Sequence, residues 1–224
     1  MTVEFGVPGR SANREYEKKV ARRERDVRSR HPVIGGALLA ISAPPQNTRA
    51  WAAGAKGEEA VGLALGTLRD RSVVALHDRH QLGTRSANID HIAIGPSGIY
   101  VIDAKWRETG RVGKRPEGPI WNRGPGRLYV GGRNETALIE KMAGQVSAVQ
   151  SVLQTIPGAS VVPIHPMIVI VNAEWGWHAS PFEIGGVWVG WRKPMVDRVT
   201  RAGPMGHEGI ATLAQALAAA LRPA

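Results

Sequence analysis

Apolar residues recur at two different spacings along this chain, and the change of spacing separates predicted helices from predicted strands. Residues 51–69 carry apolar or small side chains three and four positions apart, which predicts a helix with one buried face. Residues 134–154 show the same spacing and predict a second helix. The dense apolar run of residues 161–171 predicts a strand that is buried on both faces.

Residues 88–105, NIDHIAIGPSGIYVIDAK, have the composition of a β-hairpin. Two runs rich in Ile, Val and Tyr flank Gly-Pro-Ser-Gly, a sequence typical of a type I turn. Weaker patterns predict a strand at 71–77, a polar loop at 78–87, a minor hairpin of strands 118–121 and 127–130, a strand at 185–191 and a terminal helix at 208–222. The order helix, three strands, helix, strand, with a strand and a helix appended, favours an α/β fold whose mixed sheet has helices on both sides.

The first fifty residues differ from the rest in composition. Residues 1–12 predict disorder, and residues 13–30 predict a helix with only a thin apolar stripe. Between Arg10 and Arg30, nine Lys and Arg residues outnumber four Asp and Glu residues. This helix is either a solvated element that docks weakly or a basic arm that lies on a phosphate backbone.

We expect a basic extension over residues 1–50 and a main domain over residues 51–224. Within the extension, residues 33–43 are expected to pack against the main domain, and residues 44–47 are expected to form a linker.

The charge of the whole chain favours a polyanionic partner. The formal net charge is +10 and the pI is about 10.6, which indicates nucleic acid first and an anionic membrane surface second. The absence of cysteine excludes disulfides, thiolate metal sites and cysteine nucleophiles, and it agrees with a reducing compartment. The N-terminus has no hydrophobic signal core, and the longest apolar run is too short to span a bilayer. We therefore expect a cytoplasmic protein that binds nucleic acid and no membrane.

The hairpin brings charged residues to one face. If Gly95 pairs with Gly98, Asp90 faces Asp103, and because side chains alternate along a strand, Lys105 projects from that face too. Neighbouring carboxylates repel unless a proton or a cation neutralises them, and Mg²⁺ is often held by one or two carboxylates. The alternative is a solvated ion cluster at the end of a sheet, and a one-residue slip would separate the acids.

Two further groups of polar residues invite a functional interpretation. Glu58 shares a helix face with apolar positions, whereas Glu59 points about 100° away. A buried glutamate needs a partner, unless it lies at the rim and reaches water. His77, Asp78 and His80 could suggest a metal site, but histidines near the end of a strand are more often ordinary hydrogen-bonded residues.

Four short motifs together resemble the nuclease-related domain (NERD) family, which is similar to the PD-(D/E)xK nucleases. They read Gly54-x-x-Gly57-Glu58, Asn88-Ile-Asp90-His91, Gly95-Pro96-x-Gly98 and Ile102-Asp103-Ala104-Lys105. The resemblance covers roughly residues 51–171. It implies a restriction-endonuclease-like αβββαβ core, which agrees with the element order above, and a Mg²⁺-dependent or Mn²⁺-dependent DNA hydrolase.

The resemblance also implies a role for each matching residue. The implied catalytic set is Glu58, Asp90, Asp103, Lys105 and Gln145. Asp90 and Asp103 would bind the metal ion together with the carbonyl of Ala104. Glu58, which matches an acid on the first helix of resolvase-like relatives, would be a further metal ligand. Lys105 matches the lysine of the motif, and Gln145 lies where some relatives carry a helix glutamine.

Three functions compete for this chain. The first is a metal-dependent nuclease that hydrolyses DNA phosphodiester bonds, and the second is a nucleic-acid-binding module that keeps the fold but does not cleave. The third is a structural or partner-binding domain with an aromatic surface, which could also stack on bases or simply cover the edge of the core. Its residues would be Trp175, Trp177, Trp188 and Trp191. The complete set of two acids and a lysine favours the nuclease.

Overall fold

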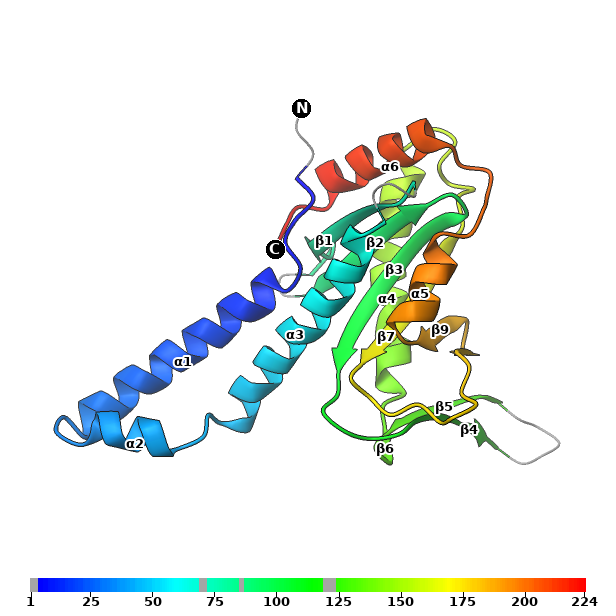
Figure 1. Ribbon diagram of the computed structural model, residues 1–224. Helices are drawn as coiled ribbons and strands as arrows, with labels where there is room; N and C mark the ends of the chain where they lie inside the picture. Colours follow the sequence, from blue (N-terminus) through cyan, green and yellow to red (C-terminus); the bar gives the residue numbers. More distant parts are fainter. Residues whose placement is uncertain (1–3, 69–71, 85–86, 119–123) are drawn as a thin grey trace.

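A six-stranded mixed sheet forms the centre of the molecule, and helices cover both of its faces (Figure 1). The computed structural model describes residues 4–68, 72–84, 87–118 and 124–224. The strand order is β1-β2-β3-β7-β9-β8. These strands are β1 (Val74–His80), β2 (Asn88–Gly95), β3 (Gly98–Trp106), β7 (Ile164–Val171), β8 (Phe182–Ile184) and β9 (Val187–Gly190). β1, β2 and β3 are antiparallel neighbours, whereas β3, β7 and β9 run parallel, so the predicted mixed α/β sheet is confirmed.

The two faces of the sheet carry separate hydrophobic cores. On one face lie α3 (Gln46–Gly66) and α5 (Arg192–Val199), and on the other lie α4 (Ala137–Gln154) and α6 (His207–Ala220). β7 contributes Ile168 and Ile170 to one core and Met167 and Val169 to the other. This division confirms the prediction of a strand buried on both faces, because alternate side chains point to opposite sides. Helix α5 was not predicted, since eight residues with a proline give little periodicity.

A small second sheet lies beside the main one. It contains β4 (Val112–Glu117), β5 (Gly124–Val130) and β6 (Arg133–Asn134). The predicted strand 127–130 lies within β5, but its partner is residues 112–117 and not 118–121, of which 119–121 lie outside the described residues. Of β4 only Val112 is buried, so backbone pairing rather than an apolar pattern defines this strand.

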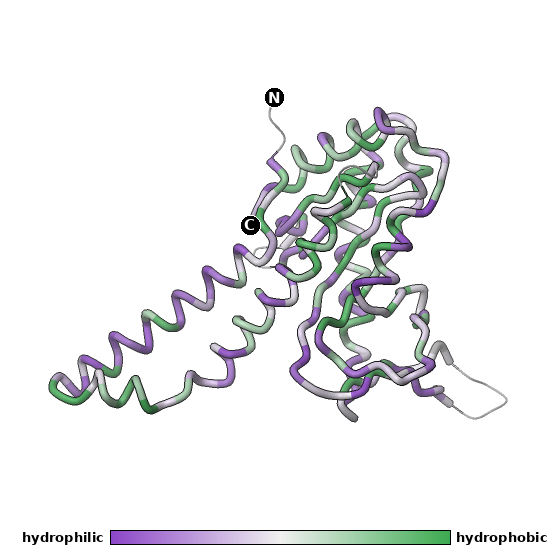
Figure 2. The backbone as a smooth tube through the Cα atoms, in the orientation of Figure 1, coloured by the Kyte–Doolittle hydropathy of each residue, from purple (hydrophilic) through white to green (hydrophobic). Residues whose placement is uncertain are grey.

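The N-terminal helices form a projection. Helix α1 (Arg10–Arg30) lies beside α3 and extends beyond the sheet, and its course is mostly hydrophilic (Figures 1 and 2). Helix α2 (Gly35–Ile41) packs against α1 at the far end of this projection. The expectation that residues 33–43 pack on the main domain is therefore wrong, and Val33 is 95% exposed. The predicted linker is shorter than expected, because α3 already begins at Gln46, directly after Pro45.

Residues 4–9 are ordered along β1, so the prediction of disorder is wrong for residues 4–12; residues 1–3 lie outside the described residues. The backbone N–H of His77 donates to the carbonyl of Phe5 at 2.8 Å. The buried Arg79 side chain donates to the carbonyls of Glu4 and Leu221. Gly6 has φ +77°, and an added Cβ would meet the carbonyl oxygen of His77, so this close approach requires glycine. Backbone hydrogen bonds of this kind leave no mark in the hydrophobic pattern.

Across the part of the chain that the structure describes, no helix is long and apolar enough to cross a membrane.

Candidate active site

The β2–β3 hairpin has the register that its turn sequence predicted. Gly95 pairs with Gly98, and the ladder continues to a last pair of His91 and Ile102. Beyond that pair, Asp90 Oδ2 accepts a hydrogen bond from the backbone N–H of Ala104 at 2.8 Å. The carboxylate of Asp90 therefore reaches the backbone between Asp103 and Lys105, and no slip separates the two acids.

The ammonium of Lys105 lies among three oxygen atoms at this end of the hairpin. Lys105 Nζ forms ion pairs with Asp103 Oδ2 at 2.6 Å and with Asp90 Oδ2 at 3.9 Å. It also donates a hydrogen bond to the carbonyl oxygen of Ala104 at 3.3 Å. These three groups are three of the four metal ligands that the family resemblance implies, the fourth being Glu58, so the hairpin gathers them around one positive charge.

Burial and mutual repulsion disturb the ionisation of this cluster. Burial raises the pKa of Asp90 to about 7; Asp103 adds to the rise, whereas Lys105 and the Ala104 N–H oppose it. Burial opposes the charge of Lys105, but the carboxylates of Asp103 and Asp90 outweigh it and hold the pKa of Lys105 above its ordinary value. The lysine is therefore charged at neutral pH, and it offsets part of the cost of placing two acids together.

Gln145 approaches the cluster from α4 on one side of the sheet. Its side chain is buried, and its Nε2 donates to Asp103 Oδ1 at 3.4 Å, which is a long hydrogen bond. Gln145 Oε1 is buried without a hydrogen-bond partner among the described residues. The structure thus places Gln145 within the buried stripe of α4, where it can orient Asp103.

Glu58 approaches from α3 and is 9% exposed. Burial, together with the carboxylates of Asp90 and Asp78, raises the pKa of Glu58 to about 9. Its neighbour Gly57 lies so close to β3 that an added Cβ would be 3.0 Å from the backbone nitrogen of Trp106. Glycine before Glu58 therefore lets α3 approach the end of β3, and the predicted inward phase of Glu58 is confirmed.

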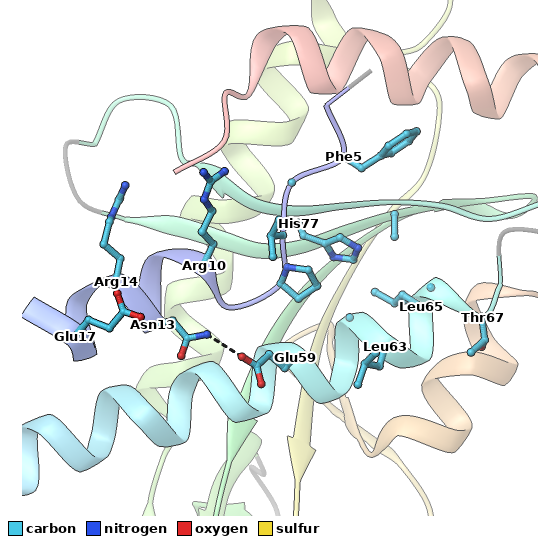
Figure 3. A pocket seen from close by; sticks show the side chains of 16 residues that line it. Phe5, Arg10, Asn13, Arg14, Glu17, Glu59, Leu63, Leu65, Thr67 and His77 are labelled. Atoms are coloured by element: carbon cyan, nitrogen blue, oxygen red, sulfur yellow. Dashed lines mark hydrogen bonds between the residues drawn. The ribbon is translucent and has the colours of Figure 1, made fainter. Parts of the chain in front are cut away.

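The neighbouring Glu59 faces away from the cluster. It is exposed, and its Oε1 accepts a hydrogen bond from Asn13 Nδ2 of α1 at 2.8 Å. A cavity of about 1090 Å³ lies here between α3 and the N-terminal segment, and Glu59 and His77 are among the residues that line it (Figure 3). None of the predicted site residues lines this cavity, so its size does not identify the reactive centre.

His77, Asp78 and His80 do not converge on a common point. The Nδ1 atoms of His77 and His91 lie 2.9 Å apart, and His80 is exposed. Asp78 accepts hydrogen bonds from the backbone N–H and the hydroxyl of Ser11, both at 2.7 Å. This carboxylate therefore anchors the start of α1. Sequence reasoning missed the roles of Ser11 and His91, which only the packing of distant segments reveals.

The donor set at the end of the hairpin fits a hard divalent cation. Carboxylate and carbonyl oxygens are the ligands that Mg²⁺ prefers, and Mg²⁺ commonly uses one or two carboxylates together with water and substrate phosphate. Asp90, Asp103 and the Ala104 carbonyl already surround a cation, the Lys105 ammonium. Within the described ranges, no group of three or more His, Cys, Asp or Glu side chains is arranged to hold a metal ion, whereas two carboxylates and the Ala104 carbonyl meet at Lys105.

The mixed sheet with helices on both faces is consistent with a nuclease-like fold. Residues 53–171, just over half of the chain, match the nuclease-related domain (NERD) family, so the chain belongs to this family. The matched segment contains every residue of the predicted set, and membership of a nuclease-related family implies a nucleic-acid partner. Comparisons with curated proteins and with solved structures gave no significant match.

Proposed function

We propose that this chain is a metal-dependent nuclease that hydrolyses DNA phosphodiester bonds, with Asp90, Asp103 and Lys105 as its catalytic set. The observation that supports this proposal is the gathering of two carboxylates and a carbonyl around the Lys105 ammonium, in a chain of the NERD family. Asp90, Asp103 and the Ala104 carbonyl would hold Mg²⁺ or Mn²⁺. When bound, such an ion lowers the pKa of a water ligand and neutralises phosphate charge.

The remaining chemistry falls to side chains of this chain. Lys105 supplies a positive charge that stabilises the negative charge developing on the phosphate. Gln145 holds Asp103 in place through its amide. Glu58 keeps a proton near neutral pH because its pKa is raised. It can release this proton when a metal ion binds, and it then adds a negative carboxylate to the site.

Affinity for DNA comes from charge that does not depend on sequence. The net charge is +10, and α1 presents exposed basic side chains along a projection beside the main sheet. Neutralised phosphates release counterions, which gives binding that weakens with salt. We propose that residues 1–50 act as a basic extension of a nuclease domain formed by residues 51–224.

The direct test is incubation of the protein with labelled single-stranded, duplex and branched DNA. We expect cleavage of at least one substrate with Mg²⁺ or Mn²⁺ and none with chelator. Asp103→Asn should abolish cleavage, whereas Asp197→Asn is the matched control, because Asp197 is exposed on α5 outside the cluster. Full cleavage in chelator, or an active Asp103→Asn enzyme, would contradict the proposal.

A second candidate function is a nucleic-acid-binding module that does not cleave. The observation that favours it is the Lys105 ammonium itself, which already neutralises the two acids without a metal ion. This function predicts salt-dependent DNA binding, no cleavage of any substrate and no change of melting temperature with Mg²⁺ or Mn²⁺.

A further inference from the structure

A cavity of about 460 Å³ lies at the carboxyl ends of β7 and β9. It is lined by the last residues of β7, the loop that follows and the beginning of α5, with Ala64 of α3 at its edge. In α/β sheets, the crevice beyond the carboxyl ends of parallel strands is where ligands usually bind. Its volume lies within the range of cavities that hold small organic ligands.

Two indole rings form one wall of this cavity. The rings of Trp175 and Trp191 lie 4.7 Å apart between centroids and are tilted by 48°, and both side chains are partly exposed. Trp175 Nε1 is buried and has no hydrogen-bond partner among the described residues. Trp177 is close in sequence but is 97% exposed and does not line the cavity. The wall therefore offers flat aromatic surface.

The rim of the cavity is positively charged. Arg192 and Lys193 line it from the first turn of α5, and both are exposed; Lys193 also forms an ion pair with Asp197 at 3.5 Å. No side chain caps this end of α5 within the described residues, so its backbone N–H groups add to the positive field. An apolar and aromatic interior with a cationic rim matches a ligand that joins a flat ring to a phosphate.

The cavity begins one strand away from the proposed catalytic lysine. In the parallel pair of β3 and β7, Lys105 is the register partner of Ile170, and Ile170 lines the cavity. Neighbouring strands in a sheet are roughly 4.8 Å apart. A nucleic-acid strand whose phosphate lies at Lys105 can therefore reach the indole wall within a few nucleotides.

We propose that this cavity is a stacking subsite that holds an unpaired base of a DNA strand beside the bond to be cleaved. This inference rests on the proposed nuclease function. The occupant is single-stranded DNA or an unpaired end, because the faces of bases in a duplex are covered by their neighbours, whereas single-strand binders combine stacking aromatics with a basic groove.

The first test changes the ligand and leaves the protein intact. Binding of a fluorescent oligothymidine of about twelve residues is measured by anisotropy in chelator, beside the same backbone with abasic residues. Both ligands carry the same phosphates, so the charge contribution is equal. We expect the abasic strand to bind about tenfold more weakly, because it has no bases to stack. Equal affinity for the two strands, or no binding of either, would overturn the proposal.

The second test removes the indole ring of Trp191, the residue directly before α5. Trp191→Leu keeps an apolar side chain but no ring, and it should lower the affinity for oligothymidine about tenfold while leaving the affinity for the abasic strand unchanged. Trp177→Leu is the matched control and should bind both strands like the wild type. A Trp191→Leu protein that still distinguishes the two strands as the wild type does would overturn the stacking role.

The two tests separate this inference from the nuclease function. Discrimination between the strands without cleavage in Mg²⁺ or Mn²⁺ would support the stacking subsite and contradict the nuclease. Cleavage without discrimination would support the nuclease and overturn the stacking subsite. If Trp191→Leu has a lower melting temperature than the wild type, the comparison of the two ligands on wild-type protein still tests whether bases contribute to binding.

Discussion

Asp90 on β2 accepts a hydrogen bond from the backbone N–H of Ala104 on β3, at 2.8 Å. This bond lies beyond the last pair of the β2–β3 ladder, and it fixes a carboxylate against the backbone that joins Asp103 to Lys105. The Asp90 side chain thus makes a structural hydrogen bond and is also a proposed metal ligand. An asparagine at position 90 could keep the hydrogen bond to Ala104 through its amide oxygen, but it would lose the negative charge.

We therefore expect Asp90→Asn to separate folding from catalysis. In chelator it should melt at the wild-type temperature or slightly above, because burial disfavours the charge that the substitution removes, and Asp103 repels that charge. It should lose cleavage and any stabilisation by Mg²⁺. Asp90→Ala, which also loses the bond to Ala104, should be less stable by about 1 kcal/mol. Melting curves with and without Mg²⁺ check these outcomes, and an Asn variant that cleaves at the wild-type rate would exclude the ligand role.

Glu58 and Glu59 provide a matched pair on α3. Glu58 is buried near the acid cluster, whereas Glu59 is exposed and bonded to Asn13. Glu58→Gln should reduce cleavage by about 10- to 100-fold, the range typical of groups that support metal ligands. Glu59→Gln should cleave like the wild type, because an exposed amide can keep the contact with Asn13. Cleavage rates of both variants at saturating Mg²⁺ are the measurement, and a larger loss in Glu59→Gln would be incompatible with the proposed site.

The hairpin was predictable because glycines fix its register. Gly95 and Gly98 close the turn, and both are also packed too tightly for a side chain: an added Cβ would lie 2.3 Å from the Val199 carbonyl oxygen at Gly95 and 2.6 Å from that of Pro163 at Gly98. Once the register was known, strand alternation placed Asp90 beside Asp103. Local sequence was therefore enough to predict how most residues of the candidate site are placed.

Contacts between distant segments were not predictable. The docking of residues 4–12 depends on backbone hydrogen bonds to β1 and on Ser11 with Asp78, and none of these changes an apolar pattern. The burial of Gln145 was not predictable either, because a polar side chain adds nothing to an apolar pattern. In the structure α4 packs against both β7 and α6, so its buried face is wide and includes Gln145.

The raised carboxyl pKa values predict how metal-free stability depends on pH. Glu58 titrates near pH 9 and Asp90 near pH 7 in the folded protein, above ordinary values of 4.5 and 3.8. The folded state therefore binds these protons more tightly than the unfolded state. The two bound protons stabilise the folded state fully at pH values below the ordinary pKa values. This stabilisation is lost as the pH rises through the pKa values of the folded protein.

In chelator, the melting temperature should thus fall from about pH 5 to about pH 9. Glu58→Gln has no such proton, so the decline at the alkaline end should be smaller in this variant. Calorimetry of both proteins at several pH values is the measurement. A metal-free wild type that becomes more stable over this range, or an unchanged profile in the variant, would disprove the assignment of raised pKa values.

The exposed arginines of α1 offer a test of the basic arm. Deleting residues 1–30 is unsuitable, because it also removes the backbone partners of His77 and Arg79. Replacing Arg25 and Arg30, both exposed, with Gln should leave melting unchanged. If both contact phosphates, the slope of log affinity against log salt should decrease in magnitude by up to about 2. Titrations of duplex DNA at several salt concentrations give the slope, and an unchanged slope would remove these two arginines from the DNA interface.

Lys105→Met should show whether the ammonium and a metal ion neutralise the same acids. Methionine keeps much of the apolar stem but leaves Asp103 and Asp90 without their cation. In chelator the variant should lose about 1–3 kcal/mol of unfolding free energy, because a partly buried charged group loses its partner. Mg²⁺ should then raise its melting temperature more than that of the wild type, since the ion no longer competes with the ammonium.

Cleavage should still be lost, because the positive side chain proposed to stabilise the phosphate charge is then missing. Lys18→Met, which breaks an exposed ion pair with Glu15, is the control and should change stability by less than about 1 kcal/mol. A Lys105→Met protein with wild-type stability in chelator and the same response to Mg²⁺ would show that the lysine and the metal do not share these ligands.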